Sequence, residues 1–355
     1  MKPKQELILR SQLAEDSVIY SCDQGRLIFN GGPATLHLNG VEQTFDGRGI
    51  LLAENDTDSN LFTTCCKREE IHKNYEHKLL GILNTSEPYE LKGNSFFCGD
   101  KFTDGNMCHA ALDHLCRAWL SKRTSLNIKN YIFYDTIWPW ARQLIESLLP
   151  SKSIFYISPL QPVKCEKVYF FANSWSGGTS NTQFHHSGMT GIPLKHPACN
   201  ANKKFLRILR RQARQLIIPT DKLPGAEKIF ISRKSKARKF SNQHEVESLF
   251  EKHGFKKLYL EDLTPSQQLA SMAKAKVVAG LHGAGLTNLI ACRPSTAVLE
   301  LTVSNSTWSY AKLAQALNLH YQMENIRPSG ETTAAACLHT TKKAINNLTS
   351  NHQNS

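Results

Sequence analysis

From Lys228 onward the sequence alternates short apolar strands with amphipathic helices, and this alternation constrains the fold more than any other feature of the chain. Strands are predicted over residues 228–232, 257–260, 276–280, 296–303 and 320–322. Helices are predicted over residues 242–253, from Thr264 with Pro265 in the first turn, from about Leu286, and over residues 307–317. Repeated strand–helix units with short connections indicate an α/β fold with a doubly wound parallel sheet.

The first half of the chain is also α/β, but it is less regular. Helices are predicted over residues 105–122 and 139–149, and strands over residues 131–134, 154–157 and 168–171. Residues up to about 95 contain many short apolar runs, from which no topology can be predicted. We divide the chain into an N-terminal α/β domain (1–175), an interdomain loop (176–197), a C-terminal Rossmann-like domain (198–328) and a C-terminal helix or tail (329–355).

Positive charge is concentrated in one segment. The formal net charge is +13, and residues 195–240 contain 14 Lys and Arg but only two acids, so this segment carries nearly all of it. Within it, residues 203–214 have the pattern of a basic amphipathic helix. Such a segment suits nucleic acid, an anionic membrane surface, the rim of a site for phosphorylated ligands, or simply a solvated helix face. No sequence signature of a nucleic-acid-binding module lies beside it.

Several features indicate an intracellular protein. The ten cysteines form no C-x-x-C pair, which argues against a zinc ribbon or redox motif and favours free thiols in a reducing compartment. No apolar run approaches the ~18 residues of a spanning helix. The N-terminal residues 1–6 are not followed by the apolar region of a signal peptide. We therefore expect a cytoplasmic location.

A glycine-rich turn is the sharpest local motif. It follows a predicted strand, opens a predicted helix, and comprises His282, Gly283, Ala284, Gly285, Leu286, Thr287 and Asn288. Glycines let a diphosphate approach the backbone, and a helix N-terminus offers unpaired N–H groups. The run is one residue short of the dinucleotide fingerprint and follows the third strand of its domain rather than the first. A serine hydrolase is excluded because no two glycines lie four residues apart, as a G-x-S-x-G elbow requires.

Charged residues at other strand ends complete a candidate diphosphate and ribose site. Glu300 lies near the end of the strand after the glycine-rich turn, where a carboxylate can accept both ribose hydroxyls. Ser232 and Arg233 end the first strand of the second half, and Arg238 follows closely. An arginine fork there could hold a diphosphate through two hydrogen bonds.

A second constellation lies on the predicted helix over residues 105–122. Asn106, His109 and Asp113 are spaced i, i+3 and i+7, so they share one face of an α-helix. A His and an Asp one turn apart can act as a general base, or as a base and the group that orients it. An ordinary polar helix face has the same pattern, so the spacing alone leaves both interpretations open.

Together these motifs resemble glycosyltransferase family 61. The resemblance rests on Ile231-Ser232-Arg233, Arg238, Asn242, Gln268, the run His282–Asn288, Glu300, and the helix with Asn106, His109 and Asp113. It spans residues 100–330 and departs at Gln243, where many relatives have an acid. It implies a GT-B architecture, with two Rossmann-like domains facing across a cleft, and an inverting transfer from a nucleotide-diphosphate sugar to a hydroxyl of a glycan.

The resemblance also assigns roles. The donor would be bound by Ser232, Arg233, Arg238, the run His282–Asn288 and Glu300. Asp113 would be the catalytic base with His109 as its orienter, or His109 would itself be the base, and Asn106 would lie on the acceptor side. The setting would be bacterial surface polysaccharide biosynthesis, such as capsule or lipopolysaccharide, with a glycan or lipid-linked acceptor and contact between the basic helix and an anionic membrane.

Two rival interpretations remain. Asp56-Thr57-Asp58 fits the D-x-D motif of metal-dependent glycosyltransferases, but too little α/β sequence precedes it to build a nucleotide-binding half. We therefore expect no metal and no cofactor beyond the sugar nucleotide. The other rival is a nucleic-acid or polyanion-binding protein that uses residues 195–240 on a Rossmann scaffold.

Overall fold

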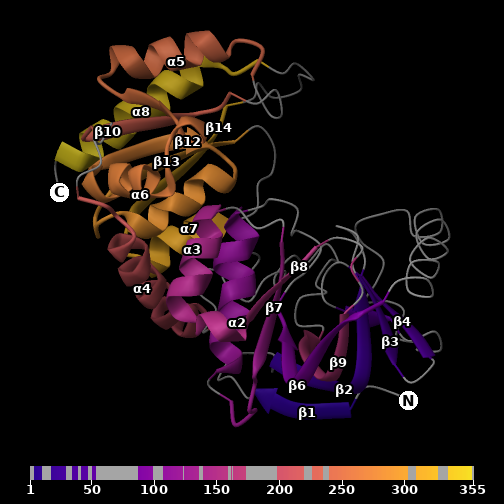
Figure 1. The fold of residues 1–355 in the computed structure, drawn as a ribbon. Coiled ribbons are helices and arrows are strands. Elements are labelled where there is room, and N and C mark those ends of the chain that lie inside the picture. Colours follow the sequence, from indigo (N-terminus) through magenta and orange to yellow (C-terminus); the bar gives the residue numbers. More distant parts are fainter. Residues whose placement is uncertain are drawn as a thin grey trace. The chain divides into compact units, whose positions relative to one another are not determined.

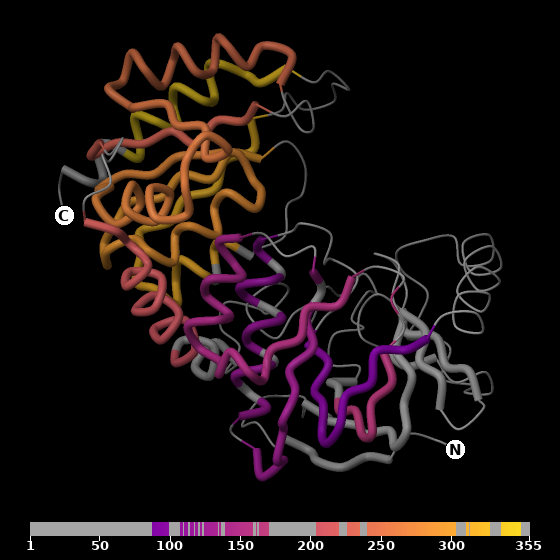
Figure 2. The backbone as a smooth tube through the Cα atoms, in the orientation of Figure 1, coloured from indigo at the N-terminus to yellow at the C-terminus, as the bar shows by residue number. Residues whose placement is uncertain are grey.

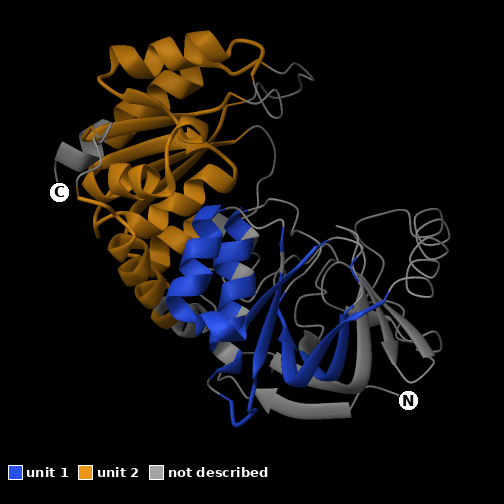
Figure 3. Ribbon diagram, in the orientation of Figure 1, with its two compact units in different colours: residues 1–198 blue, residues 199–355 orange. Residues whose placement is uncertain are grey.

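The computed structural model contains two compact units, residues 1–198 and residues 199–355, which Figure 3 colours separately. The structure describes residues 4–9, 17–28, 34–38, 41–46, 50–52, 87–98, 107–122, 124–135, 139–158, 161, 163–172, 198–219, 226–234, 240–302, 309–326 and 335–353. The interdomain loop predicted over residues 176–197 lies outside these ranges. Each unit is considered by itself.

Unit 1 is built on a mixed β-sheet. Its described strands are β1 (Lys4–Leu9), β2 (Ser17–Ile28), β3 (Ala34–Leu38), β4 (Val41–Asp46), β5 (Ile50–Leu52), β6 (Tyr89–Phe97), β7 (Asn130–Tyr134), β8 (Ile154–Ile157) and β9 (Val163–Ala172). The order is β5-β4-β3-β2-β9-β6-β7-β8, with β1 paired to β2. Strands β6 to β9 pair in parallel with one another, and the other pairs are antiparallel. Strands β7, β8 and β9 confirm the three strands predicted here.

The helices of unit 1 confirm one prediction and modify another. Helix α3 (Pro139–Leu148) begins with proline and buries Trp140, Ala141, Leu144 and Ile145, as its periodicity predicts. In the helix predicted over residues 105–122, residues 107–108 are α-helical, η2 (His109–His114) is a π-helix, and α2 (Leu115–Ser121) follows directly. The regular α-helix predicted over residues 105–122 is therefore interrupted by a wider turn.

Unit 2 contains the predicted parallel sheet. Its strands are β10 (Lys228–Ser232), β11 (Lys256–Tyr259), β12 (Val277–Leu281), β13 (Ala297–Thr302) and β14 (His320–Asn325). The order is β11-β10-β12-β13-β14, and every pair is parallel. All residues of β12 and β13 are buried, as expected when helices cover both faces of a parallel sheet. The α/β class with a doubly wound sheet is confirmed for this unit.

Helices cover the two faces of this sheet in separate layers. Helices α5 (Gln243–Lys252) and α8 (Leu338–Gln353) lie together on one face, and α6 (Pro265–Lys274), the 3₁₀-helix η6 (Ala284–Ala291) and α7 (Ser309–Ala316) lie on the other (Figure 1). The backbone trace follows α8 back beside α5 (Figure 2). On β13, Leu299 and Leu301 pack with the α5 and α8 side chains. Because side chains alternate along a strand, Glu300 points to the face that carries η6 and α7.

Two helix starts differ in how well they were predicted. Helix α6 begins as expected: the Thr264 Oγ1 accepts from the Gln267 amide at 3.3 Å, and the Gln267 side chain accepts from the Thr264 amide at 3.0 Å. The segment predicted as a helix from about Leu286 is instead the tighter 3₁₀-helix η6, which begins at Ala284. The glycine-rich turn therefore leads into a short, compact helix.

Helix α4 (Ala198–Gln215) confirms the predicted basic amphipathic helix. Its buried side chains are those of Phe205, Leu206, Leu209 and Ala213. Its exposed cations are Lys204, Arg207, Arg211 and Arg214. Arg210 lies between the two faces; its Nη2 donates to the Leu317 carbonyl at 2.7 Å, and burial lowers the pKa of its guanidinium. Among the side chains of α4 that the structure describes, one arginine thus serves packing and four cations face solvent.

Candidate functional site

The strand order of unit 2 reverses between β10 and β12. The chain runs from β10 to β11 on one side and then crosses to β12 on the other side of β10. In open parallel sheets, ligands bind beyond the carboxyl ends of the strands at such a reversal. The segment after β10 begins at Arg233, and the segment after β12 begins at His282. The fold therefore brings two of the predicted donor-binding segments to the position where this class of sheet binds ligands.

A direct contact joins these two segments. The Arg233 guanidinium donates from Nη2 to the main-chain carbonyl of His282 at 2.7 Å. A Cβ atom on Gly283 would lie 1.7 Å from that Nη2 and 2.8 Å from Cζ, so the guanidinium lies directly over the glycine. Any side chain at position 283 would displace Arg233. Gly283 is thus required for a close approach, and the group that approaches it here is an arginine.

The rest of the turn divides into buried side chains and accessible backbone. The side chains of Leu286, Thr287 and Asn288 are at most 1% exposed, and the Asn288 Nδ2 donates back to the Gly285 carbonyl at 3.1 Å. These three side chains therefore hold the shape of the turn from inside. The first amides of a helix have no partner within it, so those of Ala284 and Gly285 are the ones that can meet an anion.

His282 is fixed by a buried carboxylate. Its Nδ1 forms a hydrogen bond with the Glu300 Oε1, and the Tyr321 hydroxyl donates to the Glu300 Oε2. The Glu300 side chain is 0% exposed, whereas 27% of the His282 side chain is exposed. Burial, followed by the charge of Glu300, raises the pKa of the Tyr321 phenol, which keeps its proton. Because the Glu300 side chain is fully buried, a ribose could reach this carboxylate only if the residues that cover it moved.

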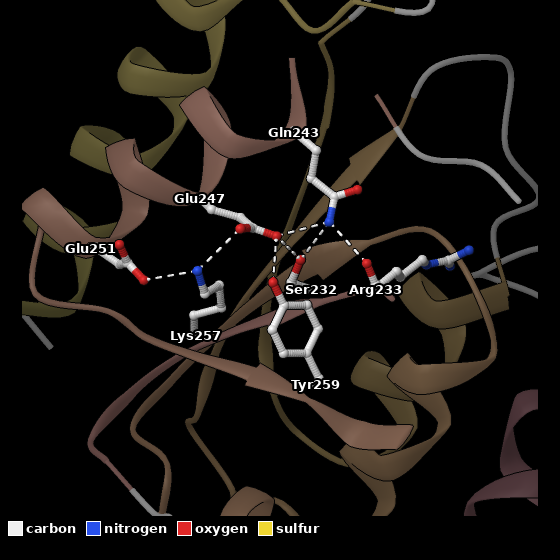
Figure 4. A network of polar contacts seen from close by, with 7 residues as sticks. All are labelled: Ser232, Arg233, Gln243, Glu247, Glu251, Lys257 and Tyr259. Atoms are coloured by element: carbon white, nitrogen blue, oxygen red, sulfur yellow. Dashed lines mark hydrogen bonds and ion pairs between the residues drawn. The ribbon is translucent and has the colours of Figure 1, made fainter. Parts of the chain in front are cut away.

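Ser232 belongs to a buried polar network, drawn in Figure 4, that sequence reasoning did not find. The Ser232 hydroxyl donates to the Glu247 Oε1 at 2.5 Å, and Ser232 is 3% exposed. The same oxygen accepts from the Tyr259 hydroxyl at 3.1 Å, and Lys257 donates to Oε2 at 3.1 Å. Ser232 was predicted to contact the donor, but its hydroxyl is engaged inside the domain.

Gln243 connects this network to Arg233. Its Nε2 lies 2.8 Å from the Glu247 Oε1, 2.9 Å from the Ser232 Oγ and 2.9 Å from the Arg233 carbonyl (Figure 4). An acid at position 243 would place a second carboxylate beside Glu247, whereas the amide donates to it. The spacing i, i+4 between Gln243 and Glu247 on an amphipathic helix was the available signal, but the strand partners come from distant segments.

The network predicts a pH-dependent stability. Burial raises the pKa of the Glu247 carboxyl, but hydrogen bonds from Ser232, Gln243 and Lys257 outweigh burial and lower the pKa from 4.5 to about 2. The carboxylate therefore stabilises the fold above pH 4.5, and this contribution is lost as the pH falls toward 2. We expect Glu247→Gln to lower the free energy of unfolding at neutral pH by about 3 kcal/mol. Urea unfolding across this pH range measures the effect.

The matched control for this prediction is Glu251→Gln. Glu251 lies one turn further along α5 and pairs with the same Lys257 at 3.2 Å, but its side chain is 49% exposed. Exposed pairs contribute about 0–1 kcal/mol, so this variant should unfold nearly like the parent. Equal destabilisation by the two substitutions would show that the buried network has no special role.

The catalytic residues predicted in unit 1 are placed only by their backbone. His109 and Asp113 lie in the π-helix η2, while Asn106 lies outside the described residues, as does Arg238 of unit 2. A π-helix has a longer turn than an α-helix, and positions four apart remain about one turn apart in it. Short π-helical turns occur frequently at functional sites. The roles assigned to these four residues remain predictions.

Other expectations from the sequence concern disulfides, metal ligands and membrane-spanning helices. Cys98, Cys108, Cys116, Cys165, Cys292 and Cys337 form no disulfide bond. Within the described residues, no group of three or more His, Cys, Asp and Glu side chains is arranged to hold a metal. Asp56 and Asp58 of the rival D-x-D motif lie outside those residues. Of the helices that the structure describes, none is both long and apolar enough to cross a membrane.

Comparison with known families agrees with the motifs. The family model described as Glycosyltransferase 61 matches residues 107–299, which run from two residues before the π-helix in unit 1 to the third residue of β13 and include Arg233 and the glycine-rich turn. No curated protein matches the chain. The matched segment is more than half of the 355 residues. The chain therefore belongs to glycosyltransferase family 61.

Proposed function

We propose that the protein is an inverting glycosyltransferase that moves a sugar from a nucleotide-diphosphate sugar to a hydroxyl of a glycan. Family membership supports the transfer of a sugar. The assignment of a nucleotide-diphosphate donor rests on one observation, the hydrogen bond between Arg233 and the turn after β12, where the strand order reverses. A guanidinium and the leading amides of a helix are groups that bind phosphates.

In this proposal the two units divide the reaction as in a GT-B enzyme. Unit 2 binds the donor, unit 1 presents the acceptor, and the two domains face each other across a cleft. Arg233 and the amides after His282 stabilise the charge that develops on the leaving diphosphate. Asp113 takes the proton of the acceptor hydroxyl as this oxygen attacks the sugar carbon from the opposite side, and His109 orients the carboxylate.

The proposal also covers the acceptor and its setting. We assign the acceptor to a glycan, free or lipid-linked, in bacterial surface polysaccharide biosynthesis at the cytoplasmic face of the membrane. The exposed cations of α4 support this setting because Lys204, Arg207, Arg211 and Arg214 lie on a single helix that contains no acid. Each such cation near an anionic lipid surface contributes about 1 kcal/mol to membrane binding.

The test of this function is ligand-dependent stability. UDP, GDP, CDP and dTDP and their sugar conjugates should be screened by thermal unfolding, followed by a transfer assay with the sugar nucleotide that gives the largest shift. A ligand at a hundred times its Kd stabilises the native state by about 2.7 kcal/mol, which is readily measured. The rival is a polyanion-binding protein. Salt-dependent retention on heparin or DNA, together with no shift from any nucleotide, would favour that rival.

We expect turnover to survive an excess of EDTA. In the proposed site the negative charge of the leaving diphosphate is balanced by Arg233 and by backbone amides, so no divalent cation is required for that step. Initial rates with and without chelator measure this. Loss of activity that manganese restores, and that Asp58→Ala abolishes, would instead indicate a metal-dependent enzyme that uses the D-x-D motif.

A further inference from the structure

Arg233 connects the candidate site to the buried polar network around Glu247. Its side chain leads away from that network and contacts the turn after β12, whereas its main-chain carbonyl faces the Gln243 amide (Figure 4). The Gln243 Nε2 donates to this carbonyl at 2.9 Å. Gln243 is therefore the link between the network and the cation to which we assign the donor diphosphate.

The main chain is fixed on both sides of Arg233. Ser232, the residue before it, ends β10 and pairs with β11 in the sheet. In the peptide that follows Arg233, the carbonyl accepts from Gln243 at 2.9 Å. The N–H of the same peptide belongs to Lys234 and donates to the Glu261 Oε1 at 3.3 Å. Because a side chain leaves the main chain at Cα, these contacts set the direction in which the guanidinium extends.

Glu247 determines which end of the Gln243 amide faces the network. An ionised carboxylate oxygen can only accept, so the Gln243 nitrogen, and not its oxygen, faces the Glu247 Oε1 at 2.8 Å. The Ser232 hydroxyl gives its proton to the same Oε1 at 2.5 Å, so its oxygen is left to accept from the Gln243 Nε2 at 2.9 Å. The nitrogen is thus held beside these two groups, and its third acceptor is the Arg233 carbonyl.

Stability alone does not account for this arrangement. The Gln243 Nε2 has two N–H bonds for three acceptors. The Gln243 Oε1 is buried and has no hydrogen-bond partner among the residues that the structure describes. A buried polar atom without a partner costs stability. The amide is therefore better suited to holding the Arg233 carbonyl than to strengthening the fold.

We propose that Gln243 is a positioning residue for the donor: it fixes the main chain of Arg233 and so holds the guanidinium where the diphosphate binds. In this assignment Gln243 does not touch the donor. The inference rests on the proposed function, because it takes Arg233 as the group that binds the diphosphate of the sugar nucleotide. A misplacement of about 1 Å in an active site can cost about a hundredfold in rate, so a contact outside the site can control binding.

The experiment is calorimetric titration of Gln243→Met with UDP, GDP, CDP, dTDP and inorganic pyrophosphate. Methionine keeps the length of the side chain and removes every hydrogen bond of the amide. For the probes that the parent binds, we expect about tenfold weaker binding and a similar loss in kcat/KM for the donor. Thermal unfolding establishes first that the variant is folded.

A second variant serves if Gln243→Met does not fold. Gln243→Asn keeps an amide, but its nitrogen lies about 1.5 Å closer to the helix and falls short of the Arg233 carbonyl. It should weaken binding in the same direction. Parent-like binding by either folded variant would overturn the inference and leave the proposed function intact.

A double-mutant cycle separates positioning from a general loss of stability. If Gln243 acts through Arg233, Gln243→Met should weaken binding in the parent and add no further loss in Arg233→Ala. A full additional loss in the Arg233→Ala background would overturn the inference, because Gln243 would then affect the donor by another route. Where Arg233→Ala binds too weakly for titration, kcat/KM for the donor gives the same cycle.

The matched control is Tyr259→Phe. The Tyr259 hydroxyl donates to the Glu247 Oε1 at 3.1 Å, so this variant also removes a donor from the network. It leaves the hydrogen bond between Gln243 and the Arg233 carbonyl in place and should bind the probes like the parent. Equal weakening in Tyr259→Phe and Gln243→Met would overturn the assignment to Gln243. Failure of the parent to bind any of the probes would remove the proposed function and the inference with it.

Discussion

Arg233→Ala should lower kcat/KM for the donor by two to three orders of magnitude while the protein remains folded. Removing one group that stabilises developing charge in a transition state costs about 10²–10³ in rate. Arg233 directly follows the last residue of β10, and its side chain donates to the main-chain carbonyl of His282. Loss of this side chain therefore leaves the sheet intact. Steady-state kinetics and the Kd for the nucleoside diphosphate measure the effect. A variant that binds the diphosphate as tightly as the parent would contradict the assigned role.

Gly283→Ala tests the position of the Arg233 guanidinium, and it also strains the backbone because Gly283 has φ +157°, which residues with a side chain rarely adopt. The added Cβ would occupy the place of the Arg233 Nη2, so the guanidinium must move away from the His282 carbonyl. We expect about tenfold or more weaker diphosphate binding. Gly254→Ala is the control: Gly254 has φ +79° and no atom within 4 Å of the added Cβ. That substitution should cost about 1 kcal/mol of stability and leave donor binding unchanged.

The parallel sheet of unit 2 was predictable because each of its elements carries a local signal. Apolar strands of four to six residues, the cap at Thr264 and the glycine after α5 can all be recognised without knowledge of distant contacts. Arg233 and the run after His282 were found for the same reason, because charged and glycine residues at strand ends stand out from apolar strands. Their meeting follows from the strand order, which brings the ends of β10 and β12 together.

The polar networks were not predictable because their members come from separate segments. Glu247 accepts hydrogen bonds from Ser232 on β10 and from Lys257 and Tyr259 on β11. The sequence around each of these residues does not indicate its partners. Glu300 was predicted to bind the donor, but its partner Tyr321 lies on the next strand, and neither this contact nor its complete burial has a local signal in the sequence. Burial also distinguishes the residues of the glycine-rich turn. Leu286, Thr287 and Asn288 are buried and shape the turn, whereas the backbone before them is accessible.

The fold of unit 1 was harder to predict, for a different reason. Its strands β1 to β5 pair antiparallel, and short apolar runs specify neither partner nor register before the sheet is known. The π-helix η2 also has no sequence signature, since it differs from an α-helix only in one wider turn. It includes both residues that we predict to carry the proton transfer.

Asp113→Asn should lower kcat by about a hundredfold or more with little change in donor affinity. Inversion needs a group to take the acceptor proton as the hydroxyl attacks, and such a general base contributes about 10²–10⁴ to the rate. The amide keeps the size of the carboxylate and removes its basicity. A loss confined to kcat is the signature of an interaction made in the transition state. Kinetics with saturating donor, together with the Kd for the nucleoside diphosphate, separate the two quantities.

His109→Ala separates the base from its orienter. Position 109 is about one turn from position 113 in η2, so either residue is a candidate for the base. With Asp113 as the base, His109→Ala should lower kcat less than Asp113→Asn does, because a carboxylate that has lost its orienter still accepts a proton. Near-full turnover in Asp113→Asn with an inactive His109→Ala would exchange the two roles. Turnover retained in both variants would make this helix structural and place the base on another element.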